Sequence, residues 1–156
     1  MTNEEQIRAH RFFSARCFND IWGIMDQPDK NQEDLETIIH LAHTSFWHWT
    51  QNPDKTASNV SVGYWILSRV YTVAQEAENA VKYGTKCLNI SIKNSLSPFY
   101  IAYGYEALAR AHLIDNNSNT AKDFLHKAQI EAEKVEDKES KELIEADLQE
   151  IENRLK

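Results

Sequence analysis

The sequence is poor in residues that interrupt helices and in residues that cross-link chains. Its 156 residues include only 4 glycines, 3 prolines and 2 cysteines. Cys17 and Cys87 make neither a disulfide framework nor a metal-binding spacing, and we expect both thiols to stay reduced. Pro28 and Pro53 stand between predicted helices and Pro98 stands where one begins, so no proline has to break a helix.

Long apolar runs and basic clusters are missing as well. No apolar stretch approaches the roughly 18 residues that a membrane span needs. The acidic first residues lack the basic and apolar parts of a signal peptide. The formal net charge is -7, and most of the acidity falls in residues 131–156. We therefore expect a cytoplasmic protein that binds neither a membrane nor nucleic acid.

Signatures of catalysis are absent too. The sequence has no Gly-rich phosphate loop, no G-x-S-x-G motif and no cysteine with an identifiable base. We therefore predict a protein that is not an enzyme and holds no cofactor.

A repeated helical pattern is what the sequence does contain. The spacing aromatic-x2-Leu-small-x2-Tyr occurs in Tyr64, Leu67, Ser68 and Tyr71, and small residues four and three apart follow at Ala80, Gly84 and Cys87. Both halves return 41 positions later, first in Tyr105, Leu108, Ala109 and His112 and then in Ala121, Leu125 and Ala128. His112 replaces a tyrosine of the pattern, and we expect a core histidine with a buried hydrogen-bond partner. The pattern resembles the tetratricopeptide repeat, stretched beyond its usual length of about 34 residues.

The whole chain also resembles a bacterial family of uncharacterised tetratricopeptide-like proteins. The strings that carry this resemblance are His43-x-Ser45-x-x-His48-Trp49, Trp65-x-x-Ser68-Arg69-Val70-Tyr71 and the run from Tyr103 to His112. The resemblance implies an all-α, right-handed αα-hairpin solenoid and a cytoplasmic location, and it implies no catalytic residue. We predict a single domain over 1–156, with hairpins at about 3–52, 56–94 and 97–135 and a capping helix at about 137–155.

A candidate groove follows from the register of the repeat. Stacking should bring the first helices of successive hairpins side by side on a concave face. Trp65, Arg69, Tyr103, Glu106 and Arg110 would then form a peptide-binding groove. Two guanidinium groups suit a carboxylate, so we expect a protein or peptide partner with an acidic side chain or a C-terminal carboxylate. The alternative is that Trp65 merely packs and the charged residues are exposed.

Two other functions stay open. His40, His43 and His48 lie on one side of the second predicted helix and are candidate metal ligands, which would make the chain a small helical metal-binding protein or enzyme. Three ligands on one ion would need help from another helix, however, and no H-E-x-x-H motif is present. The first predicted helix carries four aromatic residues, Phe12, Phe13, Phe18 and Trp22, which makes self-association into a homo-oligomer through this N-terminal face a third alternative.

Overall fold

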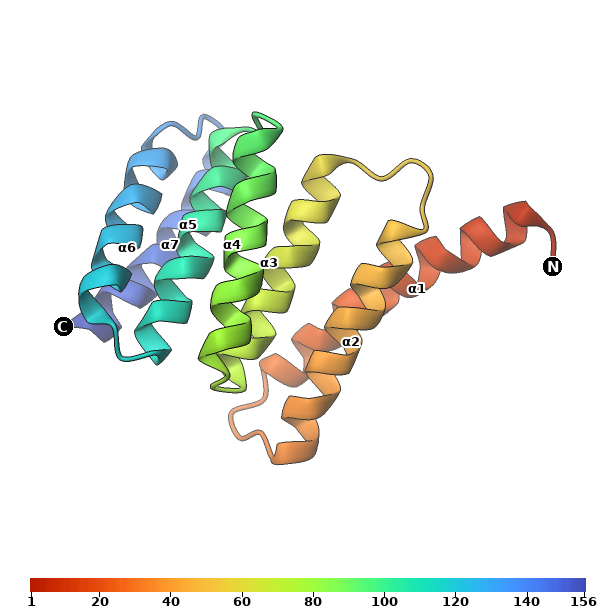
Figure 1. Cartoon of the computed structure of the whole chain (residues 1–156), viewed down its shortest axis with the longest axis horizontal. Helices are drawn as coiled ribbons and strands as arrows, with labels where there is room; N and C mark the ends of the chain where they lie inside the picture. The colour runs from red at the N-terminus through yellow and green to blue at the C-terminus, as the bar shows by residue number, and fades with distance from the viewer.

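The computed structural model describes residues 1–156 and is wholly helical, as predicted. Figure 1 shows its seven helices: α1 (Asn3–Met25), α2 (Gln32–Thr50), α3 (Ala57–Val73), α4 (Ala77–Lys93), α5 (Pro98–Ile114), α6 (Ser118–Glu133) and α7 (Lys138–Leu155). None of them has the length and the apolar character that crossing a bilayer requires.

Side chains placed just before the helices explain where several of them begin. Thr2, Asn31 and Thr56 each accept a hydrogen bond from the backbone three residues on, and the residue found there bonds back to the cap. These reciprocal bonds satisfy amide groups that otherwise have no partner in the first turn. Asn31 and Asp137 are the N-caps of α2 and α7. Ser97 is the N-cap residue of α5, directly before Pro98, but makes no side-chain capping bond.

The helices α3, α4 and α5 end in the same type of turn, and in each turn the residue with positive φ is not a glycine. Gln75, Ser95 and Asn116 follow these helices with φ angles of 62°, 48° and 55°. In each case the next amide bonds back to the last turn, for example the Glu76 amide to the Tyr71 carbonyl at 2.9 Å. This is the Schellman closure, which glycine usually supplies. It lets a chain with so few glycines make tight turns between helices.

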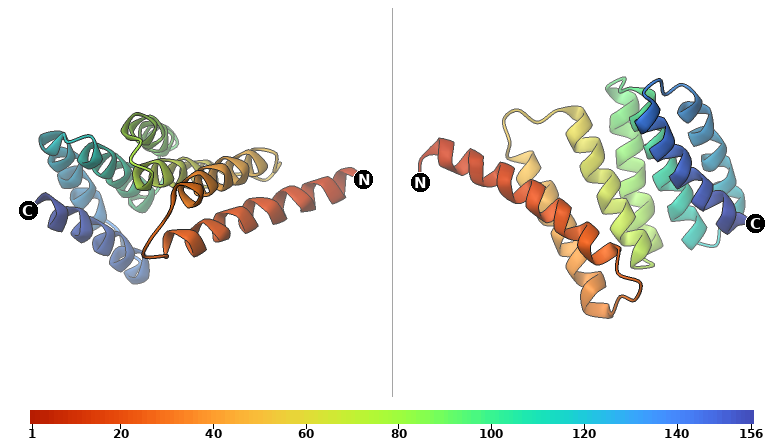
Figure 2. Two further views of the ribbon diagram at one scale, coloured as in Figure 1. Left: turned by 90° about the horizontal axis from the view of Figure 1, so that it is seen from below. Right: turned by 180° about the vertical axis from the view of Figure 1, so that it is seen from behind.

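Successive helices pack as neighbours along the whole chain, and α5 additionally contacts α3 and α7. The predicted side-by-side placement is therefore found for α3 and α5. It is wrong for the first helix, because the backbone of α1 approaches α2 only. Figure 2 shows α1 running away from the other helices toward the N-terminus, and it places α1 and α7 on the same side of the molecule.

Trp65 connects two clusters of buried side chains. The first cluster is built mainly from α1, α2 and α3 and includes Ile21, Ile38 and Ile66. The second is built from α5, α6 and α7 and includes Leu125 and Ile144. The partly buried ring of Trp65 packs against both clusters. This residue therefore joins the two halves of the core.

Two glycines allow close crossings between consecutive pairs of helices. A Cβ atom at Gly104 would lie 2.8 Å from the Leu88 Cα atom of α4. A Cβ atom at Gly63 would lie 2.5 Å from the Phe46 ring of α2. Such distances leave no room for a methyl group unless the neighbour moves. The crossings of α2 with α3 and of α4 with α5 thus depend on these glycines, which are themselves 41 positions apart.

Candidate functional site

An apolar pocket of about 370 Å³ lies between α1, α3, α5 and α7. Both α1 and α7 contribute lining residues, and Figure 2 shows these two helices on the same side of the molecule. Nine of its eleven lining residues are hydrophobic, namely Phe18 and Trp22 of α1, Val62 and Trp65 of α3, Cys87 of α4, Phe99, Tyr100 and Tyr103 of α5, and Leu143 of α7. A site of this size and composition can enclose a side chain of a partner.

Aromatic rings in contact with one another form most of the wall. The rings of Trp22 and Trp65 stack with centroids 6.0 Å apart. Trp65 meets Tyr103 edge to face at 5.4 Å, and Tyr103 meets Phe99 in the same way at 5.0 Å. Each ring is held by its neighbour, so the pocket offers large flat surfaces that lose little conformational freedom when a ligand binds.

A buried charged network lies directly behind this wall. The Trp65 indole donates a hydrogen bond of 2.8 Å to the carboxylate of Glu106, whose side chain is completely buried. Glu106 also accepts a charged hydrogen bond from the Arg110 guanidinium. Arg69 approaches the same carboxylate at 3.9 Å. Glu106 is therefore the point at which α3 and α5 are joined electrostatically.

Carboxylates of α7 complete the network around Arg110. Arg110 donates to Glu150 at 2.9 Å and lies 3.4 Å from Asp147. Burial alone would lower the pKa of Arg110, but Glu106 and Glu150 raise it above its usual value. The hydrogen bond from Arg110 lowers the pKa of Glu150. Arg110 and Glu150 are therefore both charged at neutral pH.

Tyr103 and Arg69 define the edges of the network. The Tyr103 hydroxyl donates a 2.7 Å hydrogen bond to Asp147, and burial together with this bond raises its pKa. The hydroxyl is therefore protonated and links the pocket wall to α7. Burial and the neighbouring Arg110 lower the pKa of Arg69, and its Nε atom is buried without a hydrogen-bond partner.

The five residues of the predicted groove thus lie together, but in an unexpected environment. The predicted groove would present Arg110 to a partner, whereas only 2% of this residue is exposed and α7 covers it. Trp65 and Tyr103 do line the pocket. Trp22 and Asp147 also line it and were not predicted as site residues. The stripe Leu143, Asp147, Glu150 on one face of α7 was the available sequence signal for the carboxylates.

The candidate metal ligands do not converge. The Nε2 atom of His43 lies 2.8 Å from the Tyr71 hydroxyl, while His48 lies 2.8 Å from His10, measured between Nδ1 atoms. No three His, Cys, Asp or Glu side chains are close enough to hold a metal ion.

The prediction for His112 is wrong in one respect, because its buried Nδ1 atom has no hydrogen-bond partner. Its ring stacks on Phe124 instead.

We expect His43 and His48 to make the fold less stable at mildly acidic pH. Burial, aided by His40 and Lys82, lowers the pKa of His43; burial, aided by His10, lowers that of His48. The unfolded chain therefore takes up protons more readily than the folded one as the pH falls below about 6.5. The melting temperature should drop between about pH 7.5 and 5.5. Circular dichroism should show a smaller drop for a variant carrying His43→Asn and His48→Asn. An equal drop in both proteins would contradict this prediction.

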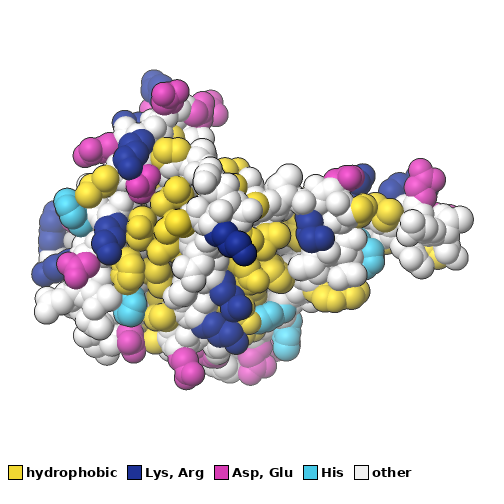
Figure 3. Space-filling model, turned by 45° about the horizontal axis from the view of Figure 1, so that its top comes forward, with side chains coloured by type: hydrophobic (Ala, Val, Ile, Leu, Met, Phe, Trp, Pro, Cys, Tyr) yellow, Lys and Arg dark blue, Asp and Glu magenta, His cyan; other side chains and the backbone are white.

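Exposed aromatic side chains lie on the first two helices. Phe12 and Phe13 of α1 and Trp47 of α2 are 57%, 46% and 55% exposed. Figure 3 shows the molecule narrowing toward its right-hand end, where Figure 1 places the N-terminus. Self-association through α1 stays a prediction, and two of the residues on which it rests, Phe18 and Trp22, line the pocket.

Comparison with known proteins adds no functional assignment. No family model, no curated protein and no solved structure matches the chain.

Proposed function

We propose that the chain is a non-enzymatic binding module that holds a protein or peptide segment on the side flanked by α1 and α7. The observation that carries this proposal is the preformed aromatic pocket of about 370 Å³. Rigid aromatic anchors surrounded by less critical contacts are typical of protein-binding surfaces. A hollow of about 540 Å³ between α6 and α7 is larger, but only three of its nine lining residues are hydrophobic.

We further propose that the helices form tandem hairpins of the tetratricopeptide type, with the right-handed arrangement that the sequence resemblance implies. Support comes from contacts between positions 41 residues apart, since the Trp65 indole bonds to the equivalent Glu106. The glycines at the two crossings, Gly63 and Gly104, keep the same offset.

The predicted preference for an acidic partner stays a prediction that the geometry does not favour. Arg110 already has three carboxylates of its own chain around it. An external carboxylate would have to displace α7 to reach it. The metal-binding alternative also lacks a favourable observation, because the three histidines of α2 do not form one ligand set.

The proposal is tested by removing one wall of the pocket. Short random peptides displayed on phage are selected on the full chain, and the recovered peptides are titrated against variants by fluorescence anisotropy. Trp22→Ala should weaken binding by about 2 kcal/mol, or about 30-fold, because it removes an aromatic anchor. Trp47→Ala is the matched control, since this tryptophan is 55% exposed and lies outside the pocket.

Two results would contradict the proposal. One is a selection that recovers no peptide whose binding saturates. The other is equal loss of binding in both variants. Circular dichroism of the two variants distinguishes a lost contact from a lost fold.

A further inference from the structure

The charge around the aromatic pocket differs in sign from the charge predicted for the groove. Asp147 is the only carboxylate among the residues that line the pocket. No lysine, arginine or histidine lines the cavity. Asp147 also belongs to the charged network, in which two guanidinium groups face three carboxylates, Asp147 included. The formal charge of the network is therefore negative by one unit.

Asp147 also keeps acceptor capacity on the pocket side. Its side chain is 27% exposed. One oxygen accepts the Tyr103 hydroxyl, and the other has only a long contact of 3.4 Å with Arg110. A carboxylate has about four lone-pair positions, so these two donors do not saturate it.

A neutral apolar ligand would contact the aromatic rings but would also displace water from the Asp147 carboxylate without offering it a hydrogen-bond donor. Removing water from an ionised group without offering a donor is unfavourable. A cation avoids this cost because it pairs with the carboxylate and is also attracted to the faces of Trp22 and Trp65. An anion would be repelled by Asp147 and would gain no cation in return.

We propose that the pocket receives a lysine or arginine side chain of the partner segment, an inference that rests on the proposed function. The methylene stem of this side chain would lie against Trp22 and Trp65, and its cationic head would lie at Asp147. Basic side chains combine an apolar stem with a charged end, and the pocket offers rings along its length and a carboxylate on its α7 wall. The partner is therefore a basic peptide segment, which also complements the net charge of -7.

The test compares three small probes on the full chain. N-acetyl-lysine methylamide carries the cation, the norleucine analogue has an apolar chain without the ammonium group, and the glutamate analogue carries the opposite charge. Binding is followed by NMR through the indole N–H signals of Trp22 and Trp65. The lysine probe should bind about tenfold more tightly than the norleucine probe, and the glutamate probe should bind most weakly. Added salt should reduce these differences.

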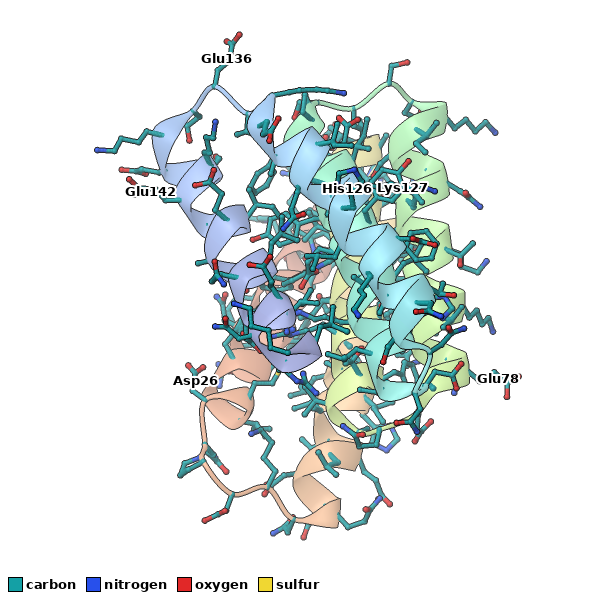
Figure 4. The ribbon with its side chains drawn as sticks, turned by 90° about the vertical axis from the view of Figure 1, so that its left-hand side faces the viewer. Asp26, Glu78, His126, Lys127, Glu136 and Glu142 are labelled. Atoms are coloured by element: carbon teal, nitrogen blue, oxygen red, sulfur yellow. The ribbon has the colours of Figure 1, made fainter.

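Asp147→Asn should bring the lysine probe to the affinity of the norleucine probe. Glu142→Gln is the matched control, because it makes the same change of charge on α7 at a side chain that is 64% exposed and points away from the other helices in Figure 4. The Glu142→Gln variant should bind the lysine probe with an affinity within about twofold of that of the unsubstituted protein.

The outcomes separate this inference from the proposed function. If the norleucine probe binds as tightly as the lysine probe, or if Asp147→Asn and Glu142→Gln behave alike, the assignment of a basic side chain is wrong while an apolar pocket remains. If selected peptides depend on Trp22 but the lysine probe causes no saturable shift, the assignment is again wrong. If neither peptides nor probes depend on the pocket, both proposals are wrong.

Discussion

Glu106→Ala is expected to lower the free energy of unfolding by about 3 kcal/mol, because it removes the completely buried carboxylate between Arg69 and Arg110. Arg110 then keeps only the partly exposed carboxylates of Asp147 and Glu150. Glu106 is 0% exposed and Arg110 2% exposed, so water cannot replace the lost carboxylate. The substitution also removes the acceptor of the Trp65 indole. Urea denaturation at neutral pH, followed by circular dichroism, measures the change.

Glu142→Ala serves as the control for this substitution. Its side chain is 64% exposed and has only a distant lysine partner at 3.8 Å, so the change should be within about 0.5 kcal/mol. Glu106→Gln should fall between the two, because an amide oxygen can still accept from Trp65 but carries no charge. A loss below about 1 kcal/mol for Glu106→Ala would show that the network does not hold α3, α5 and α7 together.

Gly104→Ala is expected to destabilise the fold by about 1–3 kcal/mol, although alanine is the better helix former. The added methyl group would meet the backbone Cα atom of Leu88 at 2.8 Å. Because that atom belongs to α4 itself, relief requires α4 and α5 to move apart. Thermal and urea unfolding of the variant measure the effect.

Gly23→Ala is the matched control on another helix. A Cβ atom at Gly23 has no neighbour within 4 Å, so the substitution should stabilise α1 by up to about 1 kcal/mol. Gly63→Ala should be less harmful than Gly104→Ala, because the opposing group is the ring of Phe46 and not backbone. Equal effects of alanine at positions 23 and 104 would contradict the close crossing of α4 and α5.

Local signals in the sequence predicted the helices well. Helix-breaking and capping residues lie where the chain turns, as Thr2, Asn31 and Pro98 do at the starts of α1, α2 and α5. Asn117 likewise caps α6, and Ser118 is already helical. Periodicity predicts which residues share a face, and Trp65 and Glu106 indeed meet.

Periodicity does not predict which element covers a face. Arg110 has the same sequence pattern whether solvent, a partner or another helix lies opposite, and only the docking of α7 decides among them. Periodicity likewise does not show that the backbone of α1 stays away from α3, because this depends on long-range packing. The side chain of Trp22 nevertheless reaches α3 and stacks on Trp65. One sequence signal could have predicted the close helix crossings. Gly63 and Gly104 are 41 positions apart, which is the repeat offset, and so indicate equivalent crossings.

The pocket wall draws on helices made early and late in synthesis. Phe18 and Trp22 come from α1, whereas Leu143 and Asp147 come from α7. A nascent chain therefore lacks the Leu143 and Asp147 part of the pocket wall until α7 has left the ribosome, even if α1 to α6 have already folded. A ligand bound as proposed, in contact with both helices, would oppose the local unfolding of each, and this protection would grow with the logarithm of ligand concentration. The complete pocket is thus a property of a chain that has folded through α7.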